Sequence, residues 1–246
     1  MASTQFDWRL RSGIASVTNF CVLLAVLASF PLVLRWTGAL DVGDAVPNTP
    51  EHTRAFVKAC LVLTVFLWIC FAIALTGVRQ RGAVTARELV GWRWTNWQAI
   101  LRDLGVAVAA LAVMAIIGGS SNALLGPLQR DTPTFRAMVA PQNGLEASAF
   151  LVSALTAGFV EEFVFRGYMQ KQCQALFANR WLASIVQVSV FTSGHFYQGW
   201  ARLVPVALIG AVLTAVALWR KSLAPGMIAH GVGDGMVAFS YFFRHL

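Results

Sequence analysis

Long apolar runs recur along the chain and constrain its fold more than any other feature. Each has, or approaches, the length of about 20 residues that a helix needs to cross a bilayer. They lie at residues 14–34, 55–77, 104–119, 146–165, 181–198, 203–219 and 223–243. Because backbone polar groups in hydrocarbon must be hydrogen-bonded within the chain, such runs predict helices. We therefore expect an all-α fold, a polytopic transmembrane helical bundle with about seven spanning helices.

The composition favours a membrane protein and argues against nucleic-acid binding. Hydrophobic residues make up 57% of the 246 residues and charged residues 12%, whereas a soluble domain carries about 25% charged residues. The formal net charge is +8, and the basic residues lie mainly between the apolar runs. This placement suits contact with anionic lipid headgroups. We expect the lipid bilayer as a partner, and no nucleic acid.

The distribution of charge between the runs predicts the orientation in the membrane. The connection between the second and third runs is rich in basic residues, namely Arg79, Arg81, Arg87, Arg93 and Arg102. The connection between the first and second runs is more acidic, with Asp41, Asp44 and Glu51. Basic connections stay in the cytoplasm. We expect a multi-pass integral membrane protein with a cytoplasmic N-terminus.

Ionisable residues within the apolar runs indicate a candidate site. A charged side chain at the bilayer centre costs roughly 2.5–3.5 kcal/mol on insertion scales, so such residues mark functional sites by default. Six of them stand out: Glu161, Glu162, Arg166, His195, His230 and Asp234. Residues four apart share one helix face, so Arg166 should pair with Glu162 rather than Glu161.

These residue types are suited to hydrolysis by an activated water. A carboxylate can take a proton from water, and a histidine can orient that water or bind a metal. Two histidines with a carboxylate also match a catalytic zinc set that keeps an open position for water. The candidate metal ligands are Glu161, His195, His230 and Asp234. Both a divalent metal, with zinc first, and a metal-free glutamate mechanism remain open.

Three motifs in order resemble the CPBP family of intramembrane proteases, which includes the CAAX prenyl endopeptidases. That family's pattern is EExxxR, then FxxxH, then HxxxN or HxxxD, on successive transmembrane helices. The corresponding stretches here are "EEFVFR" from Glu161, "FTSGH" from Phe191 and "HGVGD" from His230. The resemblance covers roughly residues 145–243. It implies N-terminal membrane helices with a basic cytoplasmic loop over 1–140 and a catalytic helical core over 141–246.

The resemblance implies an endopeptidase that cuts near the C-terminus of a membrane-associated or prenylated substrate. Glu161 would be the general base and His195 would help to bind the water. His230 and Asp234 would support the metal or the tetrahedral oxyanion, while Glu162 and Arg166 would be structural. An ionised aspartate only accepts hydrogen bonds, so Asp234 suits a metal ligand or a residue that orients a histidine better than an oxyanion donor.

Two functions of other classes remain as alternatives. A non-proteolytic relative, a membrane scaffold or immunity-type protein, could keep the same motifs. A proton-coupled transporter would use buried acids and histidines as a relay, but it predicts repeat symmetry, and the polar sites lie only in the second half.

The predicted boundaries leave one conflict. They place Glu161 near the inner end of the run 146–165, whereas His195 lies about 14 residues, roughly 21 Å, from the inner end of 181–198. Two such side chains could not meet, so at least one of these boundaries must be wrong if they share a site.

Overall fold

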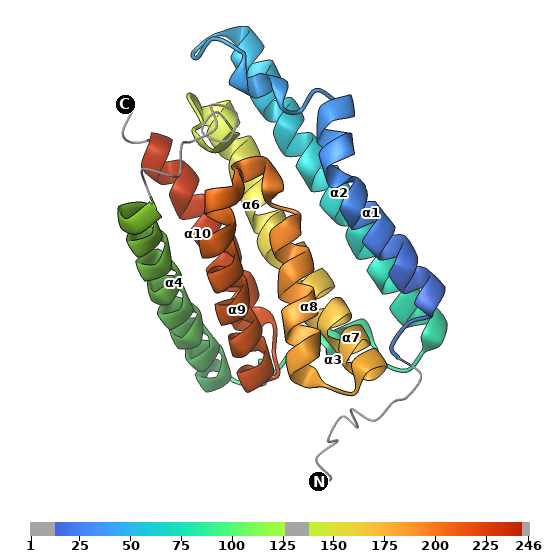
Figure 1. Ribbon diagram of the computed structural model, residues 1–246. Coiled ribbons are helices and arrows are strands. Elements are labelled where there is room, and N and C mark those ends of the chain that lie inside the picture. The colour runs from blue at the N-terminus through green and yellow to red at the C-terminus, as the bar shows by residue number, and fades with distance from the viewer. Residues whose placement is uncertain (1–12, 126–137, 243–246) are drawn as a thin grey trace.

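The computed structural model describes residues 13–125 and 138–242, and over these ranges the chain is helical, without strands. Figure 1 shows the helices running up and down in one bundle. The long helices are α1 (Val17–Trp36), α2 (Pro50–Arg81), α4 (Trp97–Leu125), α6 (Gly144–Glu161), α8 (Arg180–Ser193), α9 (Leu203–Arg220) and α10 (Ala224–Phe242). The shorter elements are η1 (Asp41–Gly43), α3 (Ala86–Val90), η2 (Glu162–Met169), α7 (Gln170–Phe177), η3 (Phe196–Gln198) and η4 (Trp200–Arg202).

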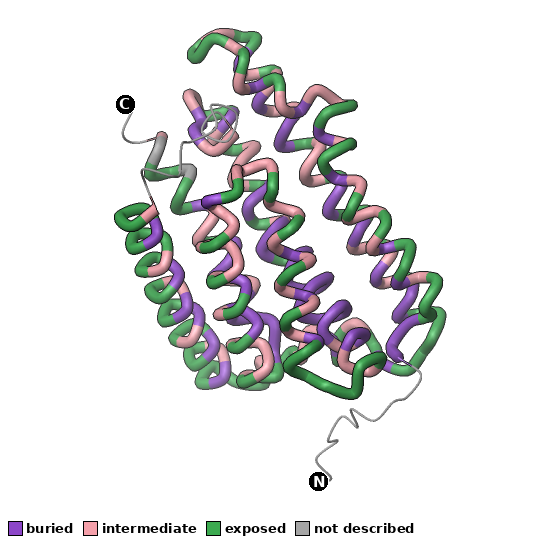
Figure 2. Tube along the Cα trace, in the orientation of Figure 1, coloured by how far each residue is buried: buried purple, intermediate pink, exposed green. Residues whose placement is uncertain are grey.

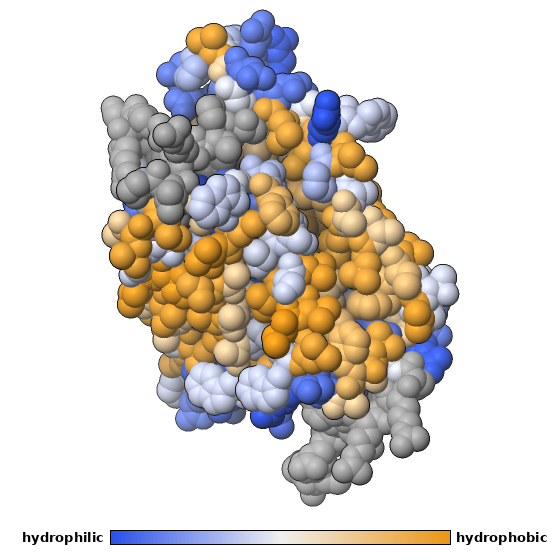
Figure 3. Space-filling model, in the orientation of Figure 1, coloured by the Kyte–Doolittle hydropathy of each residue, from blue (hydrophilic) through white to orange (hydrophobic). Residues whose placement is uncertain are grey.

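The prediction of an all-α membrane bundle is confirmed. Each of the seven apolar runs coincides with a helix, and within the described residues five segments are long and apolar enough to cross a bilayer. α8 and α10 are not among these five, and α8 has only 14 residues. Figure 3 shows an apolar band around the middle of the molecule with hydrophilic residues at both ends. The chain is therefore an integral membrane protein.

The fourth predicted span is much longer than its apolar run. α6, η2 and α7 form one continuous helical segment from Gly144 to Phe177, so the predicted boundary of 146–165 is wrong. η2 is a π-helix, in which the chain is wound more widely than in an α-helix, and such turns are frequent at functional sites. Hydropathy ended this span early because Glu161, Glu162 and Arg166 lie in its middle.

The fifth predicted span, 181–198, is also wrong at its far end. α8 ends at Ser193, and the chain then turns through residues 194–202 before α9. His195 is therefore in a connection at the end of a short helix. The long fourth segment puts Glu161 half-way along its length. These two differences remove the conflict in depth between Glu161 and His195.

Two glycines bring α6 and α10 into close contact beside the candidate site. A Cβ atom added to Gly158 would lie 2.4 Å from the backbone nitrogen of Gly231 and 2.8 Å from the carbonyl oxygen of Met227. Real Cβ atoms do not approach backbone so closely, so the crossing needs glycine here. Small residues allow membrane helices to pack backbone against backbone. This contact sets α10 next to the end of α6, where the two glutamates lie.

The N-terminal helices pack onto the same core as the candidate catalytic half. The largest core cluster combines residues of α1 and α2 with Phe163, Tyr168 and Met169 of η2. Gln172 of α7 accepts hydrogen bonds from the backbone N–H groups of Ile14 and Ala15, at 2.9 and 3.0 Å. Figure 2 shows buried positions on the faces that the helices turn toward one another.

Candidate active site

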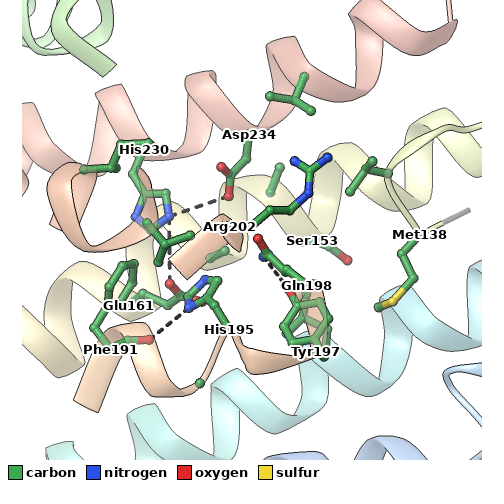
Figure 4. A pocket seen from close by; sticks show the side chains of 18 of the residues that line it. Met138, Ser153, Glu161, Phe191, His195, Tyr197, Gln198, Arg202, His230 and Asp234 are labelled. Carbon is green, nitrogen blue, oxygen red and sulfur yellow. Dashed lines mark hydrogen bonds and ion pairs between the residues drawn. The ribbon is translucent and has the colours of Figure 1, made fainter. Parts of the chain in front are cut away.

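A cavity of about 1420 Å³ lies inside the bundle and contains most of the predicted site residues. Figure 4 shows its polar part, where α6, α10 and the segment after α8 meet. Glu161, His195, His230 and Asp234 all line it, although they come from three separate parts of the chain. The rest of the wall is mainly apolar. The structure thus brings these four predicted residues to one cavity.

Glu162 and Arg166 do not line this cavity but lie directly behind it. Arg166 Nη1 donates to Glu162 Oε1 at 2.9 Å, and both side chains have no exposed area. Arg166 Nη2 donates to the carbonyl oxygen of Gly210 at 3.1 Å, and its guanidinium stacks over Phe191, 4.3 Å from the ring centroid. The predicted pairing of Arg166 with Glu162 is confirmed.

His230 links this buried ion pair to the cavity. Its Nδ1 lies 3.0 Å from Glu162 Oε1. The ionised carboxylate can only accept, so Nδ1–H donates to it. Nε2 is then directed toward the cavity, where it lies 3.8 Å from Glu161 Oε2 and 3.6 Å from Asp234 Oδ2. The His230 imidazole therefore contacts Glu162 on its buried side, and on its cavity side it faces Glu161 and Asp234.

His195 is oriented by the helix that precedes it. Its Nδ1 lies 2.9 Å from the carbonyl oxygen of Phe191, four residues earlier. A carbonyl oxygen only accepts, so Nδ1 carries the proton and Nε2 of the neutral ring is left with a lone pair. The Phe191 ring lies between the two histidines, with centroids 4.7 Å from His195 and 6.2 Å from His230. This explains the FxxxH spacing: Phe191 supports the ring of His195 and its own carbonyl selects the tautomer.

Glu161 differs from Glu162 in its partners. It is 8% exposed, and its Oε2 atom is buried without a hydrogen-bond partner. An unpaired carboxylate oxygen in such a place is costly, so a native structure needs a reason to keep it. Here the free oxygen belongs to a residue that lines the cavity, beside His230.

The predicted metal ligands are of the right kind but are not arranged around one ion. Zinc takes imidazole nitrogens and carboxylate oxygens at about 2.0–2.2 Å. Within residues 13–125 and 138–242, no three histidine, cysteine, aspartate or glutamate side chains are placed to hold a metal. His195 and the three residues around His230 share the cavity without converging on one point. We therefore derive no step through a metal.

Several polar residues of the cavity were not predicted from the sequence. Ser153, Tyr197, Gln198 and Arg202 line it together with the predicted site residues. Ser153 Oγ donates to the carbonyl oxygen of Cys60, and Gln198 Nε2 donates to the Tyr197 hydroxyl at 3.1 Å. Ser153 and Gln198 are not ionisable, Tyr197 is neutral over the usual pH range, and Arg202 lies between two apolar runs rather than within one. Polar side chains of this kind give no periodic signal.

Comparison with known protein families gives a match over part of the chain. Residues 143–236 match the model of a family described as Type II CAAX prenyl endopeptidase Rce1-like. This region of the chain is therefore similar to the CAAX protease family. Neither the curated proteins nor the solved structures gave a match. Glu161, His195 and His230 all lie within the matched Rce1-like region, as do Glu162, Arg166 and Asp234.

The Rce1-like region includes the whole polar part of the cavity, from α6 to most of α10. The family and the apolar bundle together indicate a CAAX-type intramembrane protease in general terms. α1, α2 and α4 lie outside the Rce1-like region, yet they supply Leu27, Leu63 and Met114 to the cavity wall. The N-terminal helices therefore complete the cavity around a polar site that the Rce1-like region carries.

Proposed function

We propose that the chain is an endopeptidase in which Glu161 activates a water molecule for attack on a peptide bond. The observation that supports this most strongly is the unpaired Glu161 Oε2 at the cavity wall, 3.8 Å from His230 Nε2. The neighbouring Glu162 binds Arg166 and His230 through Oε1, and its Oε2 is also buried without a partner, but Glu162 lies behind the cavity wall. A general base needs a free lone pair within reach of its water, and only Glu161 of the two lines the cavity.

In this mechanism the water lies between Glu161 and His195. This water donates one of its hydrogen atoms to Glu161 Oε2 and its other hydrogen atom to the lone pair on His195 Nε2. Its oxygen is then directed at the carbonyl carbon of the substrate. Glu161 takes the proton as the C–O bond forms. The protonated Glu161 then donates that proton to the leaving nitrogen as the C–N bond breaks, which yields a carboxylic acid and an amine.

His230 with both ring nitrogens protonated is the residue best placed to stabilise the tetrahedral oxyanion, because Nδ1–H then donates to Glu162 and Nε2–H to the oxyanion. Glu162 holds its ring by Nδ1, and Arg166 holds Glu162, so the direction of Nε2 is set before substrate binds. Preorganised donors of this kind account for much of the rate enhancement in acyl transfer. Asp234 accepts only, and it lies 3.6 Å from the same Nε2, so it orients His230 rather than binding the oxyanion.

The substrate in this proposal is a peptide or protein that is prenylated or otherwise anchored in the membrane. The largely apolar cavity wall supports this assignment, because it offers a lipid-like surface beside the polar site. Cleavage near the C-terminus of such a substrate is part of this proposal, and the similarity to CAAX prenyl endopeptidases supports it.

The decisive experiment replaces Glu161 by Gln and measures cleavage of membrane-anchored peptides. The amide keeps the shape of the side chain but loses its basicity, so we expect cleavage to fall by at least about 100-fold, the lower end of a general base's contribution. Thermal melting should change little. Glu146→Gln is the matched control, because Glu146 is a fully buried carboxylate of the same helix that does not line the cavity. Full activity in Glu161→Gln would exclude it as the general base.

A second measurement separates the metal-free mechanism from a zinc mechanism. We expect the purified protein to retain cleavage after treatment with a chelator, and to contain the same trace of zinc as its His195→Ala variant. The reason is that the described donors do not converge on one point. Stoichiometric zinc in the wild type, lost in His195→Ala together with activity, would favour the metal set instead.

A further inference from the structure

A second cavity, of about 850 Å³, lies apart from the candidate active site. It is formed where α3, α7 and α9 meet the connection between α9 and α10, and of the described residues none lines both cavities. Figure 1 shows α3 and α7 at the same end of the bundle. We infer that this second cavity binds the headgroup of an anionic phospholipid that carries hydroxyl groups. The inference goes beyond the proposed function and does not depend on it.

Cationic side chains dominate the wall of this second cavity. Six of them line it: Arg87, Arg93, Arg166, Lys171, Arg180 and Lys221. Glu88 is the one acidic residue among the described lining residues, and its carboxylate already accepts hydrogen bonds from the N–H and the hydroxyl of Thr85, at 2.7 and 3.0 Å. Basic pockets between membrane helices bind the headgroups of anionic lipids, and a guanidinium can donate two hydrogen bonds to one phosphate. The wall therefore suits a ligand that contains a phosphate.

Backbone contacts hold this wall in place before any ligand binds. The N–H of Leu223 donates to the carbonyl oxygen of Val90 at 2.8 Å, which joins the end of α3 to the connection between α9 and α10. A Cβ atom added to Gly91 would collide with the carbonyl oxygen of Lys221, so the two segments touch there. Arg93 and Lys221 are exposed residues of these two segments. Their backbones are therefore fixed on the same cavity.

Polar atoms inside the cavity lack partners that a ligand could supply. In the part of the chain that the structure describes, Arg166 Nε and the Oε1 atoms of Gln170 and Gln174 are buried without a hydrogen-bond partner. Arg166 and Gln170 are each 2% exposed. Buried polar groups in native proteins are almost always paired, so three such atoms in one wall need a reason. A bound ligand is the reason that the cavity itself offers.

The two glutamines indicate which kind of headgroup fits. Gln170 Nε2 donates to the carbonyl oxygen of Arg180 at 3.3 Å and to the hydroxyl of Ser184 at 3.1 Å, which fixes the amide oxygen on the other side. Amide oxygens only accept, whereas Arg166 Nε–H donates. A phosphate diester can accept from Arg166 but has no hydrogen to donate. Hydroxyl groups on the headgroup would supply the donors that Gln170 and Gln174 lack.

Tryptophans around the cavity place it at the level of the lipid headgroups. Trp92 belongs to its wall and is exposed. Trp181 and Trp219 are also exposed, and the guanidinium groups of Arg180 and Arg220 lie over their rings, 4.7 and 5.7 Å from the centroids. Tryptophan is enriched at the interface between a membrane and water. The phosphates of the adjacent leaflet therefore lie at the depth of the cavity, which favours a lipid over a phosphate from solution.

The test measures lipid binding to the full chain in detergent micelles, by native mass spectrometry and by thermal melting. Four probes are compared: phosphatidylglycerol, phosphatidylethanol, phosphatidylcholine and glycerol 3-phosphate. The first two carry the same diester charge, but only phosphatidylglycerol has hydroxyl groups on its headgroup. Glycerol 3-phosphate represents a ligand from solution. The test variant combines Arg93→Gln with Lys221→Gln. Arg79→Gln with Arg81→Gln is the matched control, because these exposed arginines end α2 and do not line the cavity.

We expect phosphatidylglycerol to bind most tightly and to raise the melting temperature, with phosphatidylethanol weaker and the other two probes without effect at the same concentrations. The test variant should bind phosphatidylglycerol roughly 30-fold more weakly, the factor for two basic residues lost beside an anionic lipid. The control should bind it like the wild type. Gln174→Met should remove the preference for phosphatidylglycerol over phosphatidylethanol. If the test variant melts early without lipid, Arg87→Gln, at a further exposed residue of the wall, takes its place.

Three results would overturn the inference. Equal weakening in the control would mean that surface charge alone attracts the lipid. Equal affinity of the wild type for phosphatidylglycerol and phosphatidylethanol would contradict the role of the amide oxygens. Tighter binding of glycerol 3-phosphate than of phosphatidylglycerol would assign the cavity to a ligand from solution.

Discussion

Glu161 and Glu162 are adjacent in sequence, but the proposed mechanism gives them different tasks because their surroundings differ. Glu162 has no exposed area and contacts two cationic or donor side chains, Arg166 and His230. Both glutamates keep an Oε2 atom without a hydrogen-bond partner, but only Glu161 lines the cavity. Adjacent residues on a helix point about 100° apart, so only one of them can face the cavity squarely. The chemical identity of the two residues is the same, and the environment assigns their roles.

Glu162→Gln should therefore lower both stability and activity. The amide cannot neutralise Arg166, and removing one partner of a buried ion pair costs about 3–5 kcal/mol. It also weakens the hydrogen bond that orients His230. Thermal melting and peptide cleavage on the same preparation would show the two losses together. By contrast, Glu161→Gln should lose cleavage alone.

A double variant tests whether the loss comes from the unpaired arginine. Glu162→Gln combined with Arg166→Met removes the orphaned charge, so its melting temperature should recover part of the loss of the single variant. Additive destabilisation by the two substitutions would mean that the pair does not act as a unit.

For single residues, the sequence predicted which side chains belong to the site, but it predicted only some of the interactions between them. The four-residue spacing was enough to assign Arg166 to Glu162, since this is a local property of a helix. The contacts of His230 with Glu161 and Glu162 depend on the approach of α6 and α10. The spacing of charges along one helix contains no information about that approach.

At the scale of elements, the segment from Gly144 to Phe177 shows why hydropathy misplaced the site. The apolar run ends at residue 165, just before Arg166, whereas the helix continues through the π-helix η2 and α7. The charged residues are paired inside the bundle, so they cost far less than the same residues facing lipid. The length of the span at α8 was overestimated, because the helix ends at Ser193 and the residues that follow it form a connection. Tyr197 of this connection lines the cavity.

The contact between Gly158 and Gly231 is the element-scale feature that holds the site together. Gly158→Ala would place a methyl group 2.4 Å from the backbone of α10, so the two helices must separate. Overpacking of this kind costs about 1–3 kcal/mol. We expect a lower melting temperature and reduced cleavage, because Glu161 and His230 move apart.

Gly105→Ala is the control for this prediction. Gly105 also lies within a helix, α4, but an added Cβ there would meet nothing within 4 Å. Alanine is favoured over glycine in helices by about 1 kcal/mol, so this variant should be as stable as the wild type or more stable. Equal behaviour of the two variants would mean that the glycine contact is unimportant.

For the whole molecule, the orientation in the membrane remains a prediction from the basic connections. Reporter fusions at residues 45 and 90 should report opposite sides, with residue 90 in the cytoplasm. The physical basis is the cluster of arginines around Arg87 and Arg93, which would have to cross the bilayer in the reverse orientation. The same side for both fusions would contradict the helix count as well as the orientation.

The short helix α8 has a consequence for the lipid around the protein. Its 14 residues extend only about 21 Å, against a hydrocarbon core of about 30 Å. Irregular backbone after Ser193 cannot face acyl chains, because its polar groups would lose their hydrogen bonds. Lipids next to α8 must therefore shorten or tilt their chains to match it. We therefore expect the bilayer to be thinner beside α8, and under the proposed function a scissile bond there would lie nearer to bulk water than its depth in a flat bilayer would suggest.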